Sequence, residues 1–216
     1  MTAGTPAHRS RGLYRLLEPA AAYELLQRLV GAGPARGRFV QEILRPRPGD
    51  RLLDIGCGAG GLLDALPDHV AYVGYDLNPR YIESARRRHG ARGEFHQARA
   101  GEPPAEMLAG TFDLVVAKSI LHHLDDREAG ELMEVARRAL KPGGVLVTMD
   151  PVYHPGQSPA ARWVISRDRG ARVRTPEGYR ALAAGFEVQE SGVLTDLIRI
   201  PYSHFYLRAT RLAARS

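Results

Sequence analysis

Short apolar runs alternate with helical segments through the middle of the chain, and this alternation restricts the fold more than any other sequence feature. The runs are apolar almost throughout, as expected of strands that are covered on both faces. Strands that alternate with helices favour a parallel sheet with helices packed on its two sides. We therefore predict an α/β domain with strands at 51–55, 71–75, 94–97, 112–117 and 145–149 and helices at 62–66, 79–89 and 127–140.

The beginning of the chain departs from this pattern. Residues 13–30 have apolar positions at helical spacing that Pro19 interrupts, which predicts two short helices, the second closed by Gly31 and Gly33. A third short helix is expected at 36–44.

The prediction divides the chain into a helical lid, residues 1–48, and a main domain, residues 49–216. After Asp150 the alternation weakens, and an irregular, arginine-rich insertion is expected at about 151–176. The remaining expected elements are a helix at 177–184 and strands at 186–190 and 197–208.

Composition narrows the class of protein. The 216 residues contain one cysteine, Cys57, which excludes an intramolecular disulfide framework and a cysteine-rich zinc site. The net charge of +6 permits nucleic-acid binding but does not indicate it. The chain has no run of about 18 apolar residues, and its first ten residues have no apolar stretch of the kind found in secretory signals. We expect a cytoplasmic protein without a membrane segment, either monomeric or homodimeric.

A glycine-rich turn follows the first predicted strand. Gly56, Gly58 and Gly60 alternate there, and Asp54 precedes them. Glycine permits positive φ and lets a ligand approach the backbone, and the following helix N-terminus offers free N–H groups. The spacing differs from the G-x-G-x-x-G of nicotinamide dinucleotide sites. The carboxylate of Asp54 also suits a ligand that carries an amino group.

Together with later segments, this turn resembles motif I of the class I S-adenosylmethionine-dependent methyltransferases. Residues 112–116 and the Leu-His-His-Leu sequence at 121–124 are similar to the family's fourth strand and the loop after it, and residues 140–146 to its turn into the fifth strand. The resemblance covers about residues 51–151. It implies a Rossmann-like, seven-stranded, mostly parallel sheet whose last strand, 197–208, is antiparallel. It also implies methyl transfer from S-adenosylmethionine to a small-molecule acceptor, with O- or N-methylation favoured over C-methylation.

The resemblance assigns cofactor-binding residues to the glycine turn and the strand ends. Asp76, at the end of the second strand, is placed to accept hydrogen bonds from ribose hydroxyls, with Leu77 and Asn78 beside the adenosine. The family often has an acid after the third strand for the adenine amino group, where this chain has Gln97 and Ala98. The predicted cofactor-binding residues are Asp54, Gly56, Cys57, Gly58, Gly60, Asp76, Leu77, Asn78, Gln97, Ala98, Lys118 and His123.

Methyl transfer leaves little fixed catalytic signature, because the protein mainly positions the nucleophile and excludes water. A general base helps when the acceptor is a hydroxyl or an ammonium group. The catalytic candidates are His154 and His123 as bases and Tyr153 as a ring beside the cationic methyl group. For the His122–His123 pair the alternative is packing against the cofactor or capping of the next helix. For Tyr153 and His154 it is loop packing around Pro151 and Pro155. Adjacent loop residues are poor evidence for a metal site, so we predict no metal.

The arginine-rich insertion predicts where the acceptor binds. Arginine matches the geometry of carboxylates and phosphates, which favours an anionic small molecule. A solvated loop with arginines paired to nearby acids is the alternative. The predicted substrate-binding residues are Tyr14, His122, Asp150, Arg162, Arg167, Arg169 and His204.

Three other functions stay open. An RNA methyltransferase fits the basic charge, but residues 117–120 read Ala-Lys-Ser-Ile and lack the Asn/Asp-Pro-Pro-Tyr/Phe tetrad of many enzymes that act on base amino groups. The sequence also has no basic stripe with interleaved aromatic residues. A non-catalytic module that binds S-adenosylmethionine would keep the glycine turn, whereas a dinucleotide-dependent oxidoreductase is disfavoured by its spacing.

Overall fold

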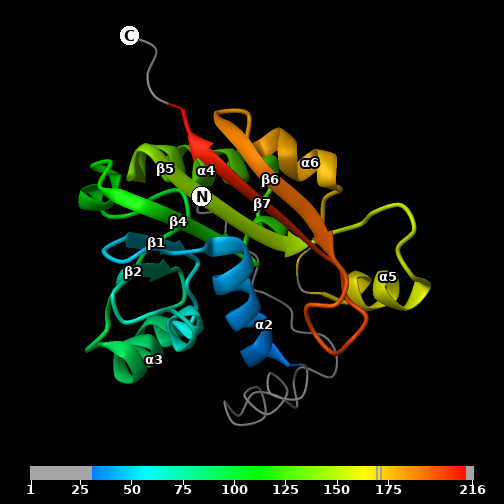
Figure 1. Ribbon diagram of the computed structural model, residues 1–216, viewed down its shortest axis with the longest axis horizontal. Helices are drawn as coiled ribbons and strands as arrows, with labels where there is room; N and C mark the ends of the chain where they lie inside the picture. Colours follow the sequence, from blue (N-terminus) through cyan, green and yellow to red (C-terminus); the bar gives the residue numbers. More distant parts are fainter. Residues whose placement is uncertain (1–30, 169, 171, 213–216) are drawn as a thin grey trace, which may run out of the picture.

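A seven-stranded sheet forms the centre of the molecule (Figure 1). The computed structural model describes residues 31–168, 170 and 172–212. Strands β1 to β5 are parallel to one another, and β7 runs antiparallel to both of its neighbours, β5 and β6. This confirms the predicted seven-stranded sheet with an antiparallel last strand. The strand order is β3-β2-β1-β4-β5-β7-β6, with bounds Arg51–Ile55 (β1), Ala71–Asp76 (β2), Gly93–Gln97 (β3), Phe112–Lys118 (β4), Leu140–Pro151 (β5), Phe186–Leu194 (β6) and His204–Arg211 (β7).

Helices cover both faces of the sheet. One face packs against α4 (Asp126–Ala139) and α6 (Pro176–Leu182). The other packs against α2 (Ala32–Arg38), its π-helical continuation η2 (Phe39–Leu44) and α3 (Pro79–His89). In Figure 1, α2 lies in front of the sheet and α4 behind it. Successive strand residues therefore enter opposite cores, which is why the strands read as continuous apolar runs.

Local sequence signals fix where two helices begin. The Asn78 side chain accepts a hydrogen bond from Arg80 N at 3.0 Å and caps α3, with Pro79 at the first helical position. At the start of α4, Asp125 and Glu128 form a reciprocal capping box. Helix α3 therefore starts shortly after β2, and α4 starts after the 3-10 helix η5 (Leu121–His123) that follows β4.

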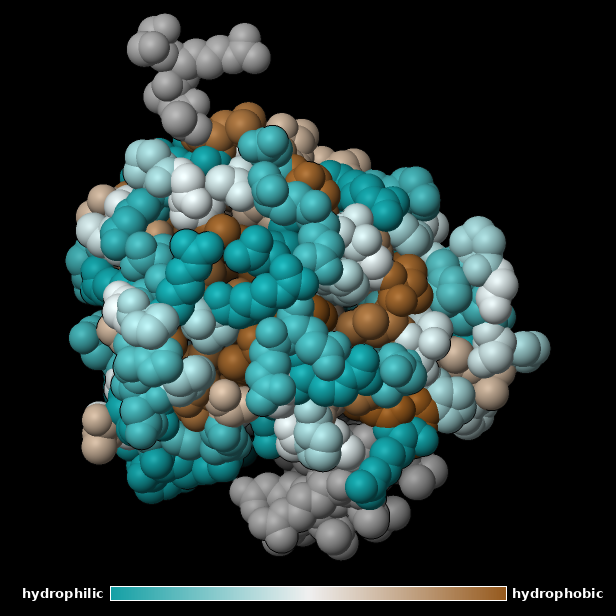
Figure 2. All heavy atoms as spheres, in the orientation of Figure 1, coloured by the Kyte–Doolittle hydropathy of each residue, from teal (hydrophilic) through white to brown (hydrophobic). Residues whose placement is uncertain are grey.

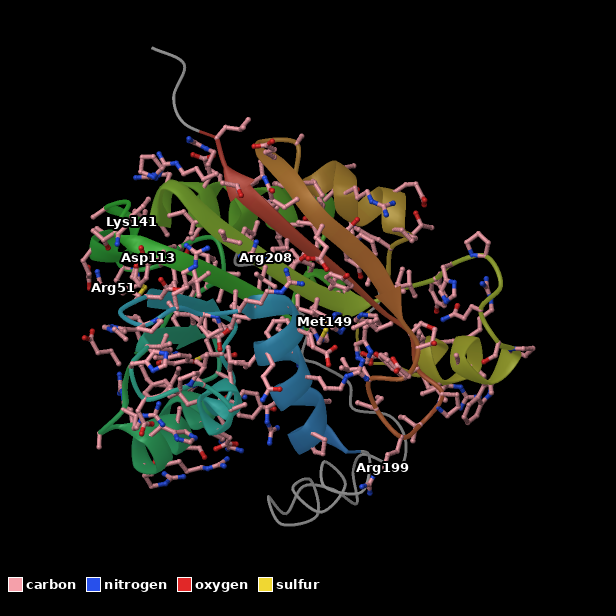
Figure 3. The ribbon with its side chains drawn as sticks, in the orientation of Figure 1. Arg51, Asp113, Lys141, Met149, Arg199 and Arg208 are labelled. Carbon is pink, nitrogen blue, oxygen red and sulfur yellow. The ribbon has the colours of Figure 1, made fainter. Side chains whose placement is uncertain are left out.

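Charged contacts hold the edge of the sheet where β1, β4 and β5 begin. Asp113 accepts hydrogen bonds from Arg51 N at 2.9 Å and from Lys141 Nζ at 2.7 Å (Figure 3). The strand order reverses between β1 and β4, so connections leave these two strands in opposite directions. In open α/β sheets ligands bind at this point, outside the carboxyl ends of the strands. The candidate site therefore lies at the edge opposite Asp113.

The structure corrects expectations for the second half of the chain. The segment 151–176 is not irregular throughout, because it contains α5 (Pro159–Ser166), capped by Ser158 and lying beyond the end of β5 (Figure 1). The last strand begins at His204 and not at residue 197. Pairing with β5 sets this start, since His204 is the partner of Pro151.

Two further expectations are wrong near the glycine turn and the first helices. The turn leads into the 3-10 helix η3 (Gly61–Asp64), not into an α-helix at 62–66. Gly33 lies inside α2 and does not end a helix, whereas Gly31 precedes α2 with a φ of 79°. The two helices expected at 13–30, and with them most of the proposed lid, lie outside the described residues.

Hydrophilic side chains dominate the face seen in Figure 2, with hydrophobic patches between them. Among the described residues, no helix combines the length and the apolar character that crossing a membrane requires.

Candidate active site

The glycine turn has the backbone conformation for which glycine is needed. Gly56, Gly58 and Gly60 have φ angles of 76°, 55° and 76°. A Cβ atom on Gly56 would lie 2.6 Å from Cδ1 of Ile120, so this glycine allows a close approach between two loops. A Cβ atom on Gly58 would meet nothing within 4 Å. The turn therefore presents bare backbone to open space at Gly58.

Asp76 is fixed beside this turn. Its Oδ2 accepts a hydrogen bond from Gly58 N at 3.0 Å, and its Oδ1 accepts one from Asn78 N at 2.8 Å. The residue is half-buried, so part of the carboxylate faces outward. An ionised carboxylate has about four lone-pair sites, which leaves acceptor capacity for hydroxyl groups of a ligand.

The predicted adenosine residues gather next to Asp76. Gln97 donates from Nε2 to the carbonyl oxygen of Leu77 at 3.4 Å. The amide of Ala98 donates to Asp76 O at 3.1 Å, so this N–H is already used within the protein. Leu77, which follows the end of β2, exposes 58% of its surface. The apolar surface of Leu77 is therefore open to a ring, with the Gln97 side chain held beside it by its hydrogen bond to Leu77 O.

Asp54 lies beneath the glycine turn and is almost fully buried. Tyr72 donates its hydroxyl hydrogen to Asp54 Oδ2 at 2.7 Å. Burial raises the pKa of Asp54 to about 6, although the Tyr72 hydrogen bond and the charge of Lys118 oppose this shift. Lys118, at the end of β4, is itself desolvated, which lowers its pKa. Asp54 and Lys118 thus interact electrostatically across the neighbouring strands β1 and β4 at the switch point.

Arg36 of α2 adds a positive charge that the sequence analysis missed. Its Nη2 lies 3.5 Å from Asp64 Oδ2, and its Nη1 would lie 3.7 Å from a Cβ atom on Gly61. The guanidinium therefore sits at the start of η3, directly after the glycine turn. No motif marks this position, because the contact depends on how α2 packs against η3.

Cys57 fills space within the turn. Burial raises the pKa of its thiol well above the usual value, so the thiol stays protonated. Its side chain is also close to β2, since a Cβ atom on Gly74 would lie 2.9 Å from Cys57 Cβ.

The buried imidazole of His122 links the end of β5 to the segment after α5. His122 Nδ1 lies 2.7 Å from Asp150 Oδ1, and His122 Nε2 lies 3.4 Å from Asp168 Oδ1. Burial alone would lower the pKa of His122, but the hydrogen bonds to Asp150 and Asp168 raise it to about 9. His122 and Asp150 thus come together, yet neither is exposed.

The predicted catalytic residues lie in different surroundings. His123 is exposed, and its ring centroid lies 4.0 Å from that of His122. His154 has both ring nitrogens engaged: Nδ1 lies 2.8 Å from Pro155 O, and Nε2 lies 3.2 Å from Ser203 Oγ. Tyr153 is half-buried under the guanidinium of Arg162, at 5.0 Å from the ring centroid.

The arginines of the insertion divide into two groups. Arg174 donates to the carbonyl oxygens of Leu121 and Leu124 and pairs with Asp126, so it holds the loop after β4. Arg162 and Arg167 instead stack on rings, Arg167 at 4.9 Å from the centroid of Trp163. Neither of these two guanidinium groups forms a salt bridge within the described part of the chain.

The remaining predicted residues are His204, Tyr14 and Arg169. His204 is buried at the start of β7 with its ring 4.8 Å from that of Tyr202, and burial lowers its pKa to about 3. Its Nδ1 has no hydrogen-bond partner among the described residues. Tyr14 and Arg169 lie outside the described residues. In that same part of the chain, no group of three or more histidine, cysteine or acidic residues is arranged to hold a metal ion.

Comparisons with known proteins show which proteins the chain resembles. Residues 53–146 match the model of a family described as a methyltransferase domain. The chain is 30% identical to the ubiquinone biosynthesis O-methyltransferase of Idiomarina loihiensis and 37% identical to the 27-O-demethylrifamycin SV methyltransferase of Amycolatopsis mediterranei. These matches cover 60% and 53% of this chain, and the chain spans only 53% and 42% of the two relatives.

Solved structures agree with the fold. The geranyl diphosphate C-methyltransferase of Streptomyces coelicolor A3(2) superposes with a TM-score of 0.66 at 18% identity, over 82% of this chain and 76% of that one. The [4+2]-cyclase SpnF superposes with a TM-score of 0.68 at 19% identity, over 85% of this chain and 82% of that one. Residues 53–146 are thus similar to a methyltransferase domain, and the chain shares the fold of these solved structures, with the seven-stranded sheet that its motifs predict.

Proposed function

We propose that the protein transfers the methyl group of S-adenosylmethionine to a small-molecule acceptor. The observation that carries this proposal is the Asp76–Gly58 contact, which places an outward carboxylate beside bare, open backbone at the switch point. Two of the relatives are an O-methyltransferase of ubiquinone biosynthesis and a methyltransferase of a rifamycin. By their names, both act on small molecules.

The residues at the turn fit S-adenosylmethionine. Open space at Gly58 admits the ligand, and Asp76 holds the ribose hydroxyls. The carboxylates of Asp54 and Asp76 favour the positive charges of the ligand's amino and sulfonium groups. Arg36 and Lys118 supply the positive charge that its carboxylate needs. When bound, the cofactor supplies an electrophilic methyl group with a neutral leaving group.

The other residues bind and orient the acceptor. Arg162 and Arg167 carry guanidinium groups without acidic partners in the described chain, which suits a carboxylate or phosphate group of the acceptor. His123 is exposed at the end of the β4 loop and takes up the proton that an O- or N-nucleophile releases. His154 is a weaker candidate than the sequence analysis suggests, because both of its ring nitrogens are engaged.

Calorimetry with S-adenosylhomocysteine tests cofactor binding. Asp76→Ala should weaken the affinity about tenfold or more, since hydrogen bonds to a charged acceptor contribute roughly 1.5–3 kcal/mol. Asp68→Ala is the matched control, because Asp68 is an exposed acid at the far edge that pairs with Arg92. Equal affinity in wild type and Asp76→Ala contradicts the proposal.

Label transfer tests the acceptor class. Methyl-labelled S-adenosylmethionine is offered with the small-molecule fraction of a cell extract or with its RNA fraction. We expect label in a small molecule, and a higher half-saturating acceptor concentration for the Arg162→Ala/Arg167→Ala variant. An Arg87→Ala/Arg127→Ala variant, which removes two surface ion pairs elsewhere, is the control. Label that ribonuclease releases would point to an RNA methyltransferase.

A protein that binds S-adenosylmethionine without transferring its methyl group is the second candidate. The observation in its favour is that His122 and His154, two of the histidines near the site, are tied up by protein groups. The structural similarity to SpnF, named as a [4+2]-cyclase, points the same way. Tight S-adenosylhomocysteine binding without label transfer to either fraction would favour this candidate.

A further inference from the structure

Segments that are far apart in the sequence meet around the imidazole of His122. Asp150 comes from the end of β5, and Asp168 follows α5. The second oxygen of Asp168, Oδ2, accepts the hydroxyl hydrogen of Tyr202 at 2.6 Å, and Tyr202 lies in the connection between β6 and β7. One chain of ion pairs and hydrogen bonds thus joins the loop after β4, the end of β5, the insertion and the approach to β7.

The central group of this chain carries a positive charge. An ionised carboxylate only accepts, so an imidazole that pairs with two ionised carboxylates carries a proton on both nitrogens and is an imidazolium. Burial raises the pKa of Asp150, but the hydrogen bond and the charge of His122 oppose this shift. Although burial opposes the shift, hydrogen bonds from His122 and Tyr202 hold the pKa of Asp168 well below its usual range. His122 exposes 3% and Asp150 1% of its surface, so water screens their interaction little.

Other charged and titratable groups surround the ring without replacing these contacts. The ring of His123, from the same loop, lies 4.0 Å from it between centroids and is tilted by 39°. Lys118, at the end of β4, faces Asp150, and the uncharged ring of His204 faces His122 from β7. The two carboxylates are therefore the groups that set the charge of His122.

The backbone of the insertion is shaped to fit His122. A Cβ atom on Gly170 would lie 1.8 Å from Cδ2 of the ring, so only glycine permits this packing. The amide of Arg172 donates to His122 O at 3.1 Å, and the amide of Tyr153 donates to Arg174 O at 3.2 Å. These hydrogen bonds link the backbone of His122 to the end of the insertion, and the end of the insertion to its start at Tyr153.

We propose that His122 is a positioning residue whose charged ring holds the described residues of the insertion, 153–168, 170 and 172–174, against the strand ends as one wall of the acceptor site. That this wall lines an acceptor site rests on the proposed function, but the docking of the segment does not depend on methyl transfer. The wall carries Tyr153, Arg162 and Arg167, so the order of these side chains depends on His122. His122 itself touches neither ligand.

Limited proteolysis measures the docking directly, because trypsin cleaves after arginine and Arg162, Arg167 and Arg172 are exposed in this segment. His122→Gln keeps one amide donor but loses the charge, and Asp168→Asn keeps the shape. Both should accelerate cleavage within 153–174 about tenfold or more, through easier local opening. His69→Gln and Asp68→Asn make the same exchanges at exposed positions and should cleave like wild type.

Tyr202→Phe tests the same link with a change that is less disruptive to folding. It removes only the outer hydrogen bond to Asp168 and should accelerate cleavage about threefold to tenfold, while Tyr81→Phe, at an exposed tyrosine, should not. Sinefungin binding should stay within about twofold of wild type in every variant. Loss of sinefungin binding together with cleavage throughout the chain would overturn the positioning role, since it would show general destabilisation.

The pH profile separates a charged link from simple packing. Wild-type cleavage, normalised to a small arginine ester at each pH, should rise between pH 7 and 10 as His122 loses its proton, and His122→Gln should show no such rise. A flat wild-type profile, or unchanged cleavage in both His122→Gln and Asp168→Asn, overturns the proposal. Because sinefungin binding is measured separately, failure of the cofactor assignment remains distinguishable from failure of the wall.

Discussion

Asp76 Oδ2 accepts a hydrogen bond from the amide of Gly58 at 3.0 Å, and this contact ties the end of β2 to the middle of the glycine turn. The amides of Gly56 and Cys57 also hold the start of the turn to β2, since both donate to the Tyr75 carbonyl, and the Asp76 contact fixes Gly58 in addition. The carboxylate proposed to hold the ribose is thus also the group that shapes the loop. Loss of Asp76 affects both functions, so a second variant is needed to separate them.

Gly58→Ala provides that separation. Gly58 has a φ of 55°, and an added Cβ atom points into open space, so alanine there is strained but fits sterically. We expect a loss of about 1 to 2 kcal/mol in the free energy of unfolding and a loss of S-adenosylhomocysteine affinity, because the methyl group occupies the ligand's space. Gly143→Ala is the matched control, with a φ of 77° and nothing within 4 Å. It should show the stability loss in urea unfolding without the loss in calorimetric affinity; equal affinity losses would remove Gly58 from the cofactor site.

How far the sequence predicts this structure depends on the range of the interactions involved. Helix α3 spans Pro79–His89 as predicted, because Asn78 and Pro79 specify its start locally. The predicted start of β7, residue 197, is wrong. The strand begins at His204, because this residue pairs with Pro151, which is distant in sequence. The same holds for the site. The glycine turn and Asp76 are readable as a local motif, whereas the partners of His122 come from β5 and from the segment after α5.

Stability should fall at alkaline pH because of His122. The folded-state pKa of His122 is raised to about 9 from 6.5, so protonation favours the folded state. Its contribution is complete below pH 6.5 and is lost as the pH rises through 9, with a slope of at most about 1.4 kcal/mol per pH unit. Urea unfolding between pH 6 and 10 measures this slope. The profile of His122→Gln should be flatter than that of wild type by this amount, and parallel profiles would show that His122 is uncharged when folded.

His204 should give the opposite dependence at acid pH. Burial lowers its pKa from 6.5 to about 3, so the unfolded chain binds the proton more tightly than the folded protein does. The stability contributed by neutral His204 is present above pH 6.5 and is lost as the pH falls toward 3. The free energy of unfolding of wild type should therefore drop between pH 6.5 and 4.5 more steeply than that of His204→Gln. A histidine resonance of His204 that titrates near pH 6.5 in the folded protein would contradict this expectation.

Gly170→Ala should disrupt the segment after α5 although the change is one methyl group. The added Cβ atom would lie 1.8 Å from Cδ2 of His122, and His122 cannot yield because both of its nitrogens are bonded to carboxylates. The backbone around Gly170 must therefore move away from His122. We expect a loss of about 2 kcal/mol or more in the free energy of unfolding. Gly130→Ala is the reference, since Gly130 lies in α4 with open space around it and alanine favours a helix by about 0.5 to 1 kcal/mol. Thermal unfolding should place the two variants on opposite sides of wild type, and a Gly170→Ala protein as stable as wild type would mean that the segment does not pack on His122 in solution.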